Sequence, residues 1–154
     1  VWGGHQYTDW LIKWVKDFSR SIDYLETRSD IDTAKLVYYG FSWGGSMAGI
    51  IAAVEDRLSV AMIVTGGLYS ERYSYPEADV INYLPRISIP VLMLSGKYDL
   101  FFPAETSVKP FFNFLGTPDK DKRLIFYETD HFMPANEMKK ETLNWLDRYL
   151  GPVN

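Results

Sequence analysis

Four short apolar runs, separated by segments with helical periodicity, constrain the fold of this chain most strongly. They span residues 35–39, 58–65, 90–95 and 123–127. Their lengths and apolar composition are typical of strands that are buried on both faces. Strands that alternate with helices form a parallel sheet with helices on both sides. We therefore expect an α/β protein, a three-layer α/β/α sandwich with about four mainly parallel strands, in which residues 1–154 form a single domain.

Helices are expected around these runs, over residues 7–28, from the small residues after Ser42 to about residue 54, and over 77–83, 103–115 and 136–150. In the first helix, apolar residues recur every three or four positions, and Thr8 or Asp9 is the expected N-terminal cap. The fourth helix is expected to break or kink at Pro110. In the last helix, the residues expected to face inward are Met138, Leu143, Leu146, Tyr149 and Leu150.

The composition narrows the classes of function. The 154 residues include no cysteine and only two histidines, and their formal net charge is −4. We therefore expect no disulfide, no metal site and no other cofactor. No basic run favours nucleic acid or an anionic membrane as a partner. No apolar run approaches the ~18 residues of a membrane span, and no signal peptide is visible, so we expect a cytoplasmic protein.

Three residues with complementary chemistry follow three of the four apolar runs. Ser42 follows the first run, Asp99 the third and His131 the fourth. The carboxyl ends of parallel strands meet at the edge where α/β sheets hold their active sites. A histidine in this arrangement takes the proton of the serine, and the carboxylate holds the histidine's tautomer. The expected intermediate is an acyl-enzyme on Ser42 that water releases.

Glycines surround Ser42 in the segment Gly40-Phe41-Ser42-Trp43-Gly44-Gly45. A sharp turn from strand to helix lifts the serine hydroxyl above the sheet and strains its backbone angles. We expect Gly40 and Gly44 to lie where a side chain has no room. The amino end of the following helix favours developing negative charge. The backbone N–H of Trp43 is the expected oxyanion donor.

Each of these residues also has an ordinary structural interpretation. Ser42 could cap a helix, Asp99 could form a turn, and His131 could lie in a surface loop. Asp130 adjoins His131 in sequence and cannot easily reach its ring from there. His5 precedes the first predicted helix and is not expected to take part in catalysis.

Three motifs together resemble those of a known family. Gly-Phe-Ser-Trp-Gly-Gly, Gly-Lys-Tyr-Asp-Leu-Phe-Phe-Pro and Asp-His-Phe are similar to segments of the α/β-hydrolases of the dienelactone-hydrolase and prolyl-oligopeptidase-like group. The resemblance covers nearly all of the chain and implies a serine hydrolase with the triad Ser42, Asp99 and His131. The family fold has eight strands and this chain accounts for the last four, which implies a truncated α/β-hydrolase core.

The missing strands have two consequences. The family's second oxyanion N–H comes from a loop in the absent part, and Gly3 and Gly4 match a His-Gly-Gly type of oxyanion motif only superficially. The first run would be central in the complete sheet but is an edge here. Because an unpaired apolar edge favours association, we expect a homodimer through the strand between Leu36 and Tyr39, or a further segment that covers it.

We consider three functions. The first is a carboxylesterase for short acyl esters, because a plain serine triad suits ester cleavage and no insertion marks a lipase lid. The second is a prolyl-oligopeptidase-like peptidase. The third is a non-catalytic or weakly active fragment without a complete oxyanion hole.

Aromatic residues near the proposed triad could bind the small-molecule ester. Core packing is the alternative for these side chains, and residues 69–85, with Tyr73, Tyr75 and Tyr83, could form a small cap above them. The candidate substrate-binding residues are Phe41, Tyr69, Phe101, Phe102 and Phe132.

Overall fold

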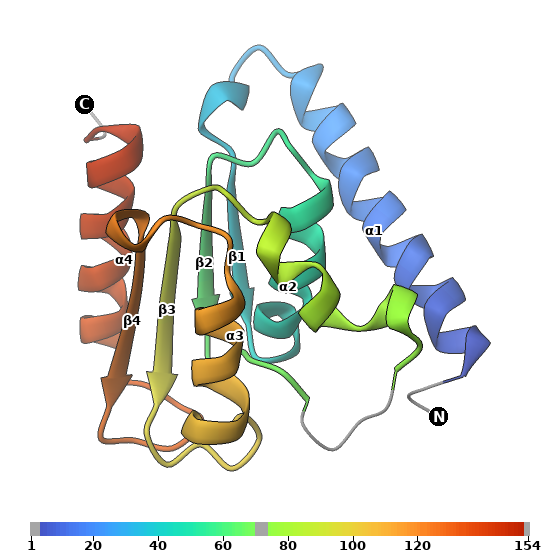
Figure 1. Cartoon of the computed structure of the whole chain (residues 1–154). Helices are drawn as coiled ribbons and strands as arrows, with labels where there is room; N and C mark the ends of the chain where they lie inside the picture. The colour runs from blue at the N-terminus through green and yellow to red at the C-terminus, as the bar shows by residue number, and fades with distance from the viewer. Residues whose placement is uncertain (1–3, 70–73, 153–154) are drawn as a thin grey trace.

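The sheet is wholly parallel. The computed structural model describes residues 4–69 and 74–152, and the structural statements below refer to these residues. All three strand pairs are parallel, in the order β1-β2-β3-β4, so the four arrowheads in Figure 1 end at the same edge. The predicted α/β class and the four-stranded parallel core are confirmed. The strands are β1 (Val37–Phe41), β2 (Val60–Val64), β3 (Val91–Gly96) and β4 (Lys122–Tyr127).

Helices cover both faces of this sheet. Alternate side chains of β2 point to opposite faces, as the twofold period of a strand requires. Ala61 and Ile63 join a core with residues of α1, α2 and α3, whereas Val60 and Met62 pack with Trp145 of α4. The structure therefore has the three layers that the sequence predicts. The helices are α1 (His5–Glu26), α2 (Trp43–Val54), α3 (Lys109–Phe114) and α4 (Ala135–Leu150).

Two predictions about the helices are wrong. The first helix begins at His5 with Gly4 as its N-cap, so Thr8 and Asp9 lie inside it. In α4, Leu143 is 59% exposed and Trp145 is the buried residue. Two positions along an α-helix differ by about 200° around its axis, so the two side chains point to nearly opposite sides. The sequence pattern of α4 had assigned Leu143 to the wrong face.

The segments at 77–83 and 103–115 are less regular than expected. The first consists of three 3₁₀ turns, Pro76–Ala78, Val80–Asn82 and Leu84–Arg86. In the second, a π-helical turn over Ala104–Val108 leads into α3. Pro110 lies in the first turn of α3, where a missing N–H costs no helical bond. The change of helix type therefore lies just before the proline.

None of the described helices is long and apolar enough to cross a bilayer.

Candidate active site

Ser42 lies at the junction of β1 and α2, as the motif predicts. Its backbone has φ 55° and ψ −115°, which is the positive-φ region that non-glycine residues rarely adopt. The N–H of Ser42 donates to the carbonyl of Val64 at 2.9 Å, and its carbonyl accepts from the N–H of Ser46 at 3.0 Å. The sheet and α2 therefore hold this strained turn from both sides.

The structure brings the three predicted catalytic residues together. Nε2 of His131 lies 2.9 Å from Oγ of Ser42, and Nδ1 of His131 lies 2.7 Å from Oδ2 of Asp99. The Asp99 side chain is fully buried. Its other oxygen, Oδ1, accepts from the N–H groups of Phe101 at 2.8 Å and Phe102 at 3.1 Å. The carboxylate is thus held by its own loop and directed at the histidine.

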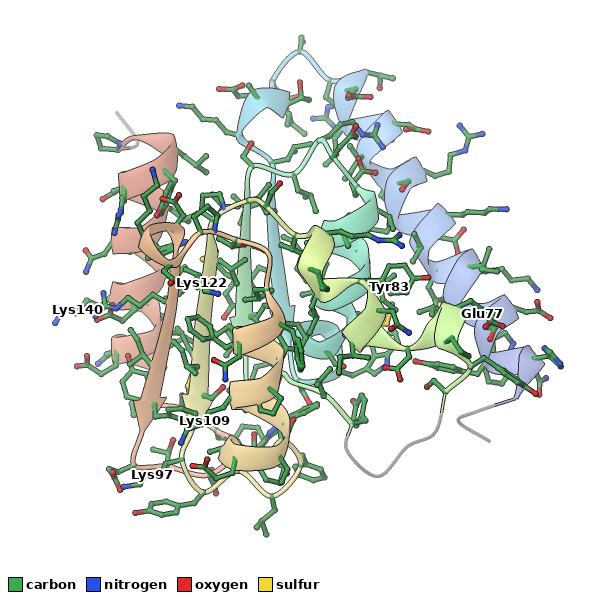
Figure 2. The ribbon with its side chains drawn as sticks, viewed as in Figure 1. Glu77, Tyr83, Lys97, Lys109, Lys122 and Lys140 are labelled. Atoms are coloured by element: carbon green, nitrogen blue, oxygen red, sulfur yellow. The ribbon has the colours of Figure 1, made fainter. Side chains whose placement is uncertain are left out.

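The loops that carry Asp99 and His131 are tied to each other. The N–H of Tyr98 donates to the carbonyl of Thr129 at 3.0 Å. On the exposed side, Glu128 accepts from Nζ of Lys97 at 2.6 Å and from the hydroxyl of Tyr98 at 2.5 Å. Figure 2 shows Lys97 at the end of the sheet where the strands finish. These contacts fix the distance between the carboxylate and the imidazole.

The hydrogen bonds at Glu128 also shift the pKa values of the three residues that form them. The hydrogen bond from Lys97, followed by that from Tyr98, lowers the pKa of Glu128. The same carboxylate raises the pKa of Lys97 and of Tyr98. Around neutral pH, Lys97 therefore stays positively charged, Glu128 stays negatively charged and Tyr98 keeps its hydroxyl proton. All three hydrogen-bonding groups are then in the state that these contacts need.

The glycines around Ser42 are not equivalent. A Cβ on Gly40 would lie 2.3 Å from the carbonyl oxygen of Gly44, and a Cβ on Gly45 would lie 2.9 Å from Cα of Gly66. A Cβ on Gly44 would meet only the Tyr38 hydroxyl, at 4.0 Å. The expectation of a close approach is confirmed for Gly40 and is wrong for Gly44. The tight position on the helix side is Gly45, because α2 packs there against the turn after β2.

Trp43 occupies the first position of α2, directly after Ser42. The first N–H groups of a helix have no partner within it, and Trp43 carries the first of these groups in α2. The residues weighed for a second donor are elsewhere: Gly4 caps α1, and Gly3 lies outside the described residues.

Aromatic rings surround His131. The ring centroids of Phe101, Phe41 and Phe132 lie 5.0, 5.5 and 5.6 Å from that of His131. All three side chains are exposed, Phe101 and Phe132 by more than 70%. Phe102 is buried, with its centroid 6.2 Å from that of His131. The exposed rings can contact a ligand, whereas Phe102 supports the histidine from the core.

Three further residues weighed from the sequence, Tyr69, His5 and Asp130, contact neighbouring residues. Tyr69 packs on Phe102, with a centroid distance of 5.0 Å. His5 stacks on Tyr75 at 4.5 Å. Asp130 accepts from the N–H of Phe132 at 2.9 Å and so shapes its own loop. Tyr73 lies outside the described residues.

The sequence analysis did not identify two residues that support the site, Glu128 and Tyr38. Glu128 ties the catalytic loops, and Tyr38 donates from its hydroxyl to the carbonyl of Gly44 at 2.6 Å. Burial raises the pKa of Tyr38 to about 12, so the hydroxyl stays protonated and remains a donor. No local sequence signal marks either role, because each depends on a contact between separate segments.

A serine on a strand-to-helix turn, facing a histidine and a buried carboxylate at the carboxyl edge of a parallel sheet, defines the α/β-hydrolase class. Comparison with known proteins narrows this class. The chain belongs to the dienelactone hydrolase family, whose sequence pattern matches residues 6–142. It is therefore an α/β hydrolase of that family.

Individual relatives agree with this assignment. A Yersinia pestis protein provisionally named carboxymethylenebutenolidase is 30% identical over 132 residues, which cover 82% of this chain and 49% of the relative. Cutinase 1 of Thermobifida cellulosilytica is 26% identical over 126 residues, covering 80% of this chain and 44% of the relative. The chain thus spans about half the length of these curated relatives.

Solved structures show the same fold. A cold-adapted esterase from an Arctic intertidal metagenomic library superposes with a TM-score of 0.73 at 25% identity, over 88% of this chain and 57% of the esterase. A Pyrococcus furiosus esterase superposes with a TM-score of 0.75 at 17% identity, over 89% of this chain and 62% of the esterase. The second likeness concerns the fold alone.

Proposed function

We propose that this protein is a serine hydrolase that cleaves short-chain carboxylic esters through an acyl-enzyme on Ser42. The observation that carries the proposal is the continuous hydrogen-bonded line from Ser42 through His131 to the buried Asp99. The family assignment and the esterases among the relatives support the reaction class. The match covers only about half of each curated relative, so a relative's activity does not by itself establish the activity of this protein. The activity is therefore proposed here.

The geometry suggests a two-stage mechanism. Oγ of Ser42 attacks the ester carbonyl while Nε2 of His131 takes the hydroxyl proton. The tetrahedral oxyanion lies against the amino end of α2 and the N–H of Trp43. The C–O bond then breaks, and His131 returns the proton to the leaving alcohol. Water attacks the acyl-enzyme, with His131 again as the base, and the acid leaves as Ser42 regains its proton.

Asp99 contributes by stabilising charge on His131. The imidazole becomes positive at each proton transfer, and a carboxylate 2.7 Å from Nδ1 stabilises that charge in a buried setting. The same contact fixes the tautomer in which Nε2 accepts the serine proton. The N–H groups of Phe101 and Phe102 balance the cost of burying the carboxylate.

The exposed rings suggest where the substrate binds. Phe41, Phe101 and Phe132 would contact the apolar part of an ester whose carbonyl lies at Ser42. The described residues place no lid over these rings, which favours short and accessible esters.

Loss of one oxyanion donor typically costs ~100–1000-fold in rate, so a weakly active fragment is the alternative if a second donor is needed.

The test is turnover of p-nitrophenyl acetate and butyrate by the wild-type chain, Ser42→Ala and the control Ser59→Ala. We expect turnover that Ser42→Ala abolishes and Ser59→Ala retains, because the hydroxyl of Ser59 only bonds to the carbonyl of Ala34. A fluorophosphonate should label Ser42. Absence of both turnover and labelling would refute an enzymatic role for this chain.

The peptidase alternative has a separate readout. Prolyl-oligopeptidase-like enzymes hold the peptide amine with charged groups, and the described residues around His131 are mainly aromatic. Cleavage of prolyl-amide substrates with little ester turnover would favour the peptidase.

A further inference from the structure

Three exposed phenylalanine rings converge on the catalytic imidazole from three segments of the chain. Phe41 ends β1, Phe101 follows β3 and Phe132 follows β4. Each ring meets that of His131 edge to face. The rings of Phe41 and Phe132 also lie 6.3 Å apart and 28° from parallel. Phe101 is 72% exposed and Phe132 is 71% exposed, so this phenylalanine cluster offers a free apolar surface beside the imidazole.

Proton transfer decides which half of an ester lies at the phenylalanine cluster. Nε2 of His131, 2.9 Å from Oγ of Ser42, gives its proton to the leaving oxygen when the ester bond breaks. A proton donor must lie within hydrogen-bond distance of the atom that it protonates. The leaving oxygen therefore lies at Nε2. The group attached to that oxygen, which is the alcohol half of the ester, then lies beside the imidazole and within reach of the rings that surround it.

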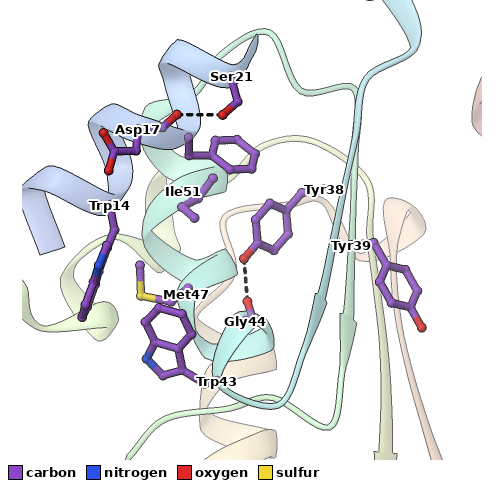
Figure 3. A pocket seen from close by; sticks show the side chains of 10 residues that line it. Trp14, Asp17, Ser21, Tyr38, Tyr39, Trp43, Gly44, Met47 and Ile51 are labelled. Carbon is purple, nitrogen blue, oxygen red and sulfur yellow. Dashed lines mark hydrogen bonds between the residues drawn. The ribbon is translucent and has the colours of Figure 1, made fainter. Parts of the chain in front are cut away.

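The groove between α1, β1 and α2 is the other apolar surface near the nucleophile. It has a volume of about 440 Å³, and Figure 3 shows Trp43 beside Met47 and Trp14 in it. Its lining contains no member of the triad and none of the three phenylalanines. We therefore assign the alcohol to the phenylalanine cluster, because only those rings contact the group that protonates the leaving oxygen.

The charges around His131 favour a neutral alcohol. The imidazole becomes positive at each proton transfer, and this charge repels a cationic group at the adjoining rings. The carboxylate of Asp130 accepts from the N–H of Phe132 and repels an alcohol that carries a carboxylate. A neutral aromatic group avoids both effects and gains ring-to-ring contacts with the cluster.

We propose that the phenylalanine cluster binds the alcohol half of the ester, and that the preferred alcohol is neutral and aromatic, as benzyl alcohol is. This inference rests on the proposed esterase function and names the substrate class of that site. The acyl half is small, because the cluster is occupied by the alcohol.

The same cluster gives the chain a second activity, acyl transfer to such an alcohol. This transfer is the reverse of acylation, so the attacking alcohol occupies the site of the leaving alcohol. Nε2 of His131 takes the hydroxyl proton while the alcohol oxygen bonds to the acyl carbon. The bond from that carbon to Oγ of Ser42 then breaks, and Oγ regains a proton from Nε2. Water and the bound alcohol compete for one acyl-enzyme.

The first test compares two isomeric esters that carry one phenyl ring on opposite sides of the ester group. These are benzyl acetate and methyl phenylacetate. Each kcat/KM is divided by the rate of hydrolysis by hydroxide, which removes the difference in chemical reactivity. We expect the corrected value to be about tenfold higher for benzyl acetate, as a group bound in an apolar site typically gives.

The second test measures acyl transfer directly. The acetyl-enzyme is formed from p-nitrophenyl acetate in the presence of benzyl alcohol or methanol at equal concentration. These alcohols have nearly the same acidity, so a difference between them reports binding. We expect about tenfold more benzyl acetate than methyl acetate to form.

Variants of the cluster connect both preferences to the rings. Phe101→Ala and Phe132→Ala should each lower the preference for benzyl acetate over its isomer by about threefold. A displaced His131 would slow both esters alike, so the ratio isolates binding of the alcohol. Phe114→Ala is the matched control, since Phe114 is also exposed but ends α3, which leads back to the start of β4 (Figure 1). It should keep the wild-type ratio.

The outcomes separate this inference from the proposed function. Turnover of p-nitrophenyl acetate with equal corrected rates for the two isomers would overturn the inference and leave the esterase in place. A preference for methyl phenylacetate that Phe132→Ala removes would assign the rings to the acyl half instead. A preference for benzyl acetate that both cluster variants retain would exclude these rings as its cause. No turnover of any ester would overturn the inference and the proposed function together.

Discussion

The hydroxyl of Tyr38, inside β1, holds the carbonyl of Gly44 in the first turn of α2 at 2.6 Å. This bond crosses the turn that carries Ser42 and joins its two sides. The same ring lies close to Gly40, where an added Cβ would approach it within 2.7 Å. One buried tyrosine therefore both fills the space under the turn and fixes the start of the helix.

Replacing Tyr38 with phenylalanine should loosen this turn. The variant keeps the ring and loses the hydrogen bond, so we expect the free energy of unfolding to fall by ~1 kcal/mol. Ester turnover should fall as well, because Ser42 is less firmly placed. Urea denaturation and p-nitrophenyl acetate kinetics measure the two effects. Tyr39→Phe is the control, because it removes only an exposed hydrogen bond from the Tyr39 hydroxyl to Sδ of Met138, at 3.3 Å. Equal behaviour of the two variants would contradict the positioning role.

Removing the charge of Asp99 should nearly abolish turnover without unfolding the protein. Asp99→Asn keeps the size of the side chain and removes the negative charge that stabilises the imidazolium of His131. In serine triads this change lowers kcat by about 10⁴-fold. Asp130→Asn, next to the same histidine, should retain turnover because Asp130 bonds only to its own loop. Steady-state kinetics with circular dichroism of both variants test the assignment.

The glycines beside Ser42 should tolerate alanine unequally. Gly45→Ala forces Cβ against the backbone of Gly66 and should cost ~1–3 kcal/mol of stability. Gly44→Ala meets no close atom and should leave stability unchanged or raise it by up to about 1 kcal/mol, because alanine favours a helix. Thermal unfolding of the two variants compares them directly. A larger loss for Gly44→Ala would refute the packing that we describe.

A buried carboxylate should make the fold sensitive to acid. Glu55 accepts from Arg57 at 2.6 and 2.7 Å, and this pairing lowers the pKa of Glu55. Arg57 also bonds to Asp23 and Glu26, which ties α1 to the loop before β2. A lowered pKa gives stability that is complete above the ordinary carboxyl pKa and is lost as pH falls through the folded value.

Glu55→Gln should therefore flatten the acid side of the stability curve. The wild-type urea midpoint should fall more steeply between about pH 5 and pH 3 than that of the variant. The exposed Glu77→Gln is the control and should follow the wild type. Parallel curves for Glu55→Gln and wild type would show that this carboxylate contributes nothing to acid sensitivity.

Breaking the tie at Glu128 should have a small effect that depends on salt. Exposed ion pairs contribute little, so Glu128→Gln should lower kcat/KM by less than about fivefold at low ionic strength. The difference from wild type should shrink at high salt, because screening weakens the Lys97–Glu128 pair. It should also shrink in acid, as the wild-type carboxylate gains its proton. A difference that is constant across salt would point instead to the hydrogen bond from the uncharged Tyr98 hydroxyl.

The sequence by itself determined the order of elements and the residues that meet at the site. Apolar runs and helical periodicity are local features, and a parallel sheet brings the carboxyl ends of its strands to one edge. Ser42, Asp99 and His131 could therefore be placed together from their positions after three of the runs. The strained turn at Ser42 was predictable because its glycines are adjacent in sequence.

Only the tertiary structure decided which side chains support that site. Tyr38 and Glu128 act across segments that periodicity does not relate, and the tight glycine is Gly45 because α2 packs against the turn after β2. Leu143 and Trp145 are both apolar, and packing on the sheet selects Trp145 for burial. Such choices depend on distances between distant parts of the chain, which local sequence patterns do not encode.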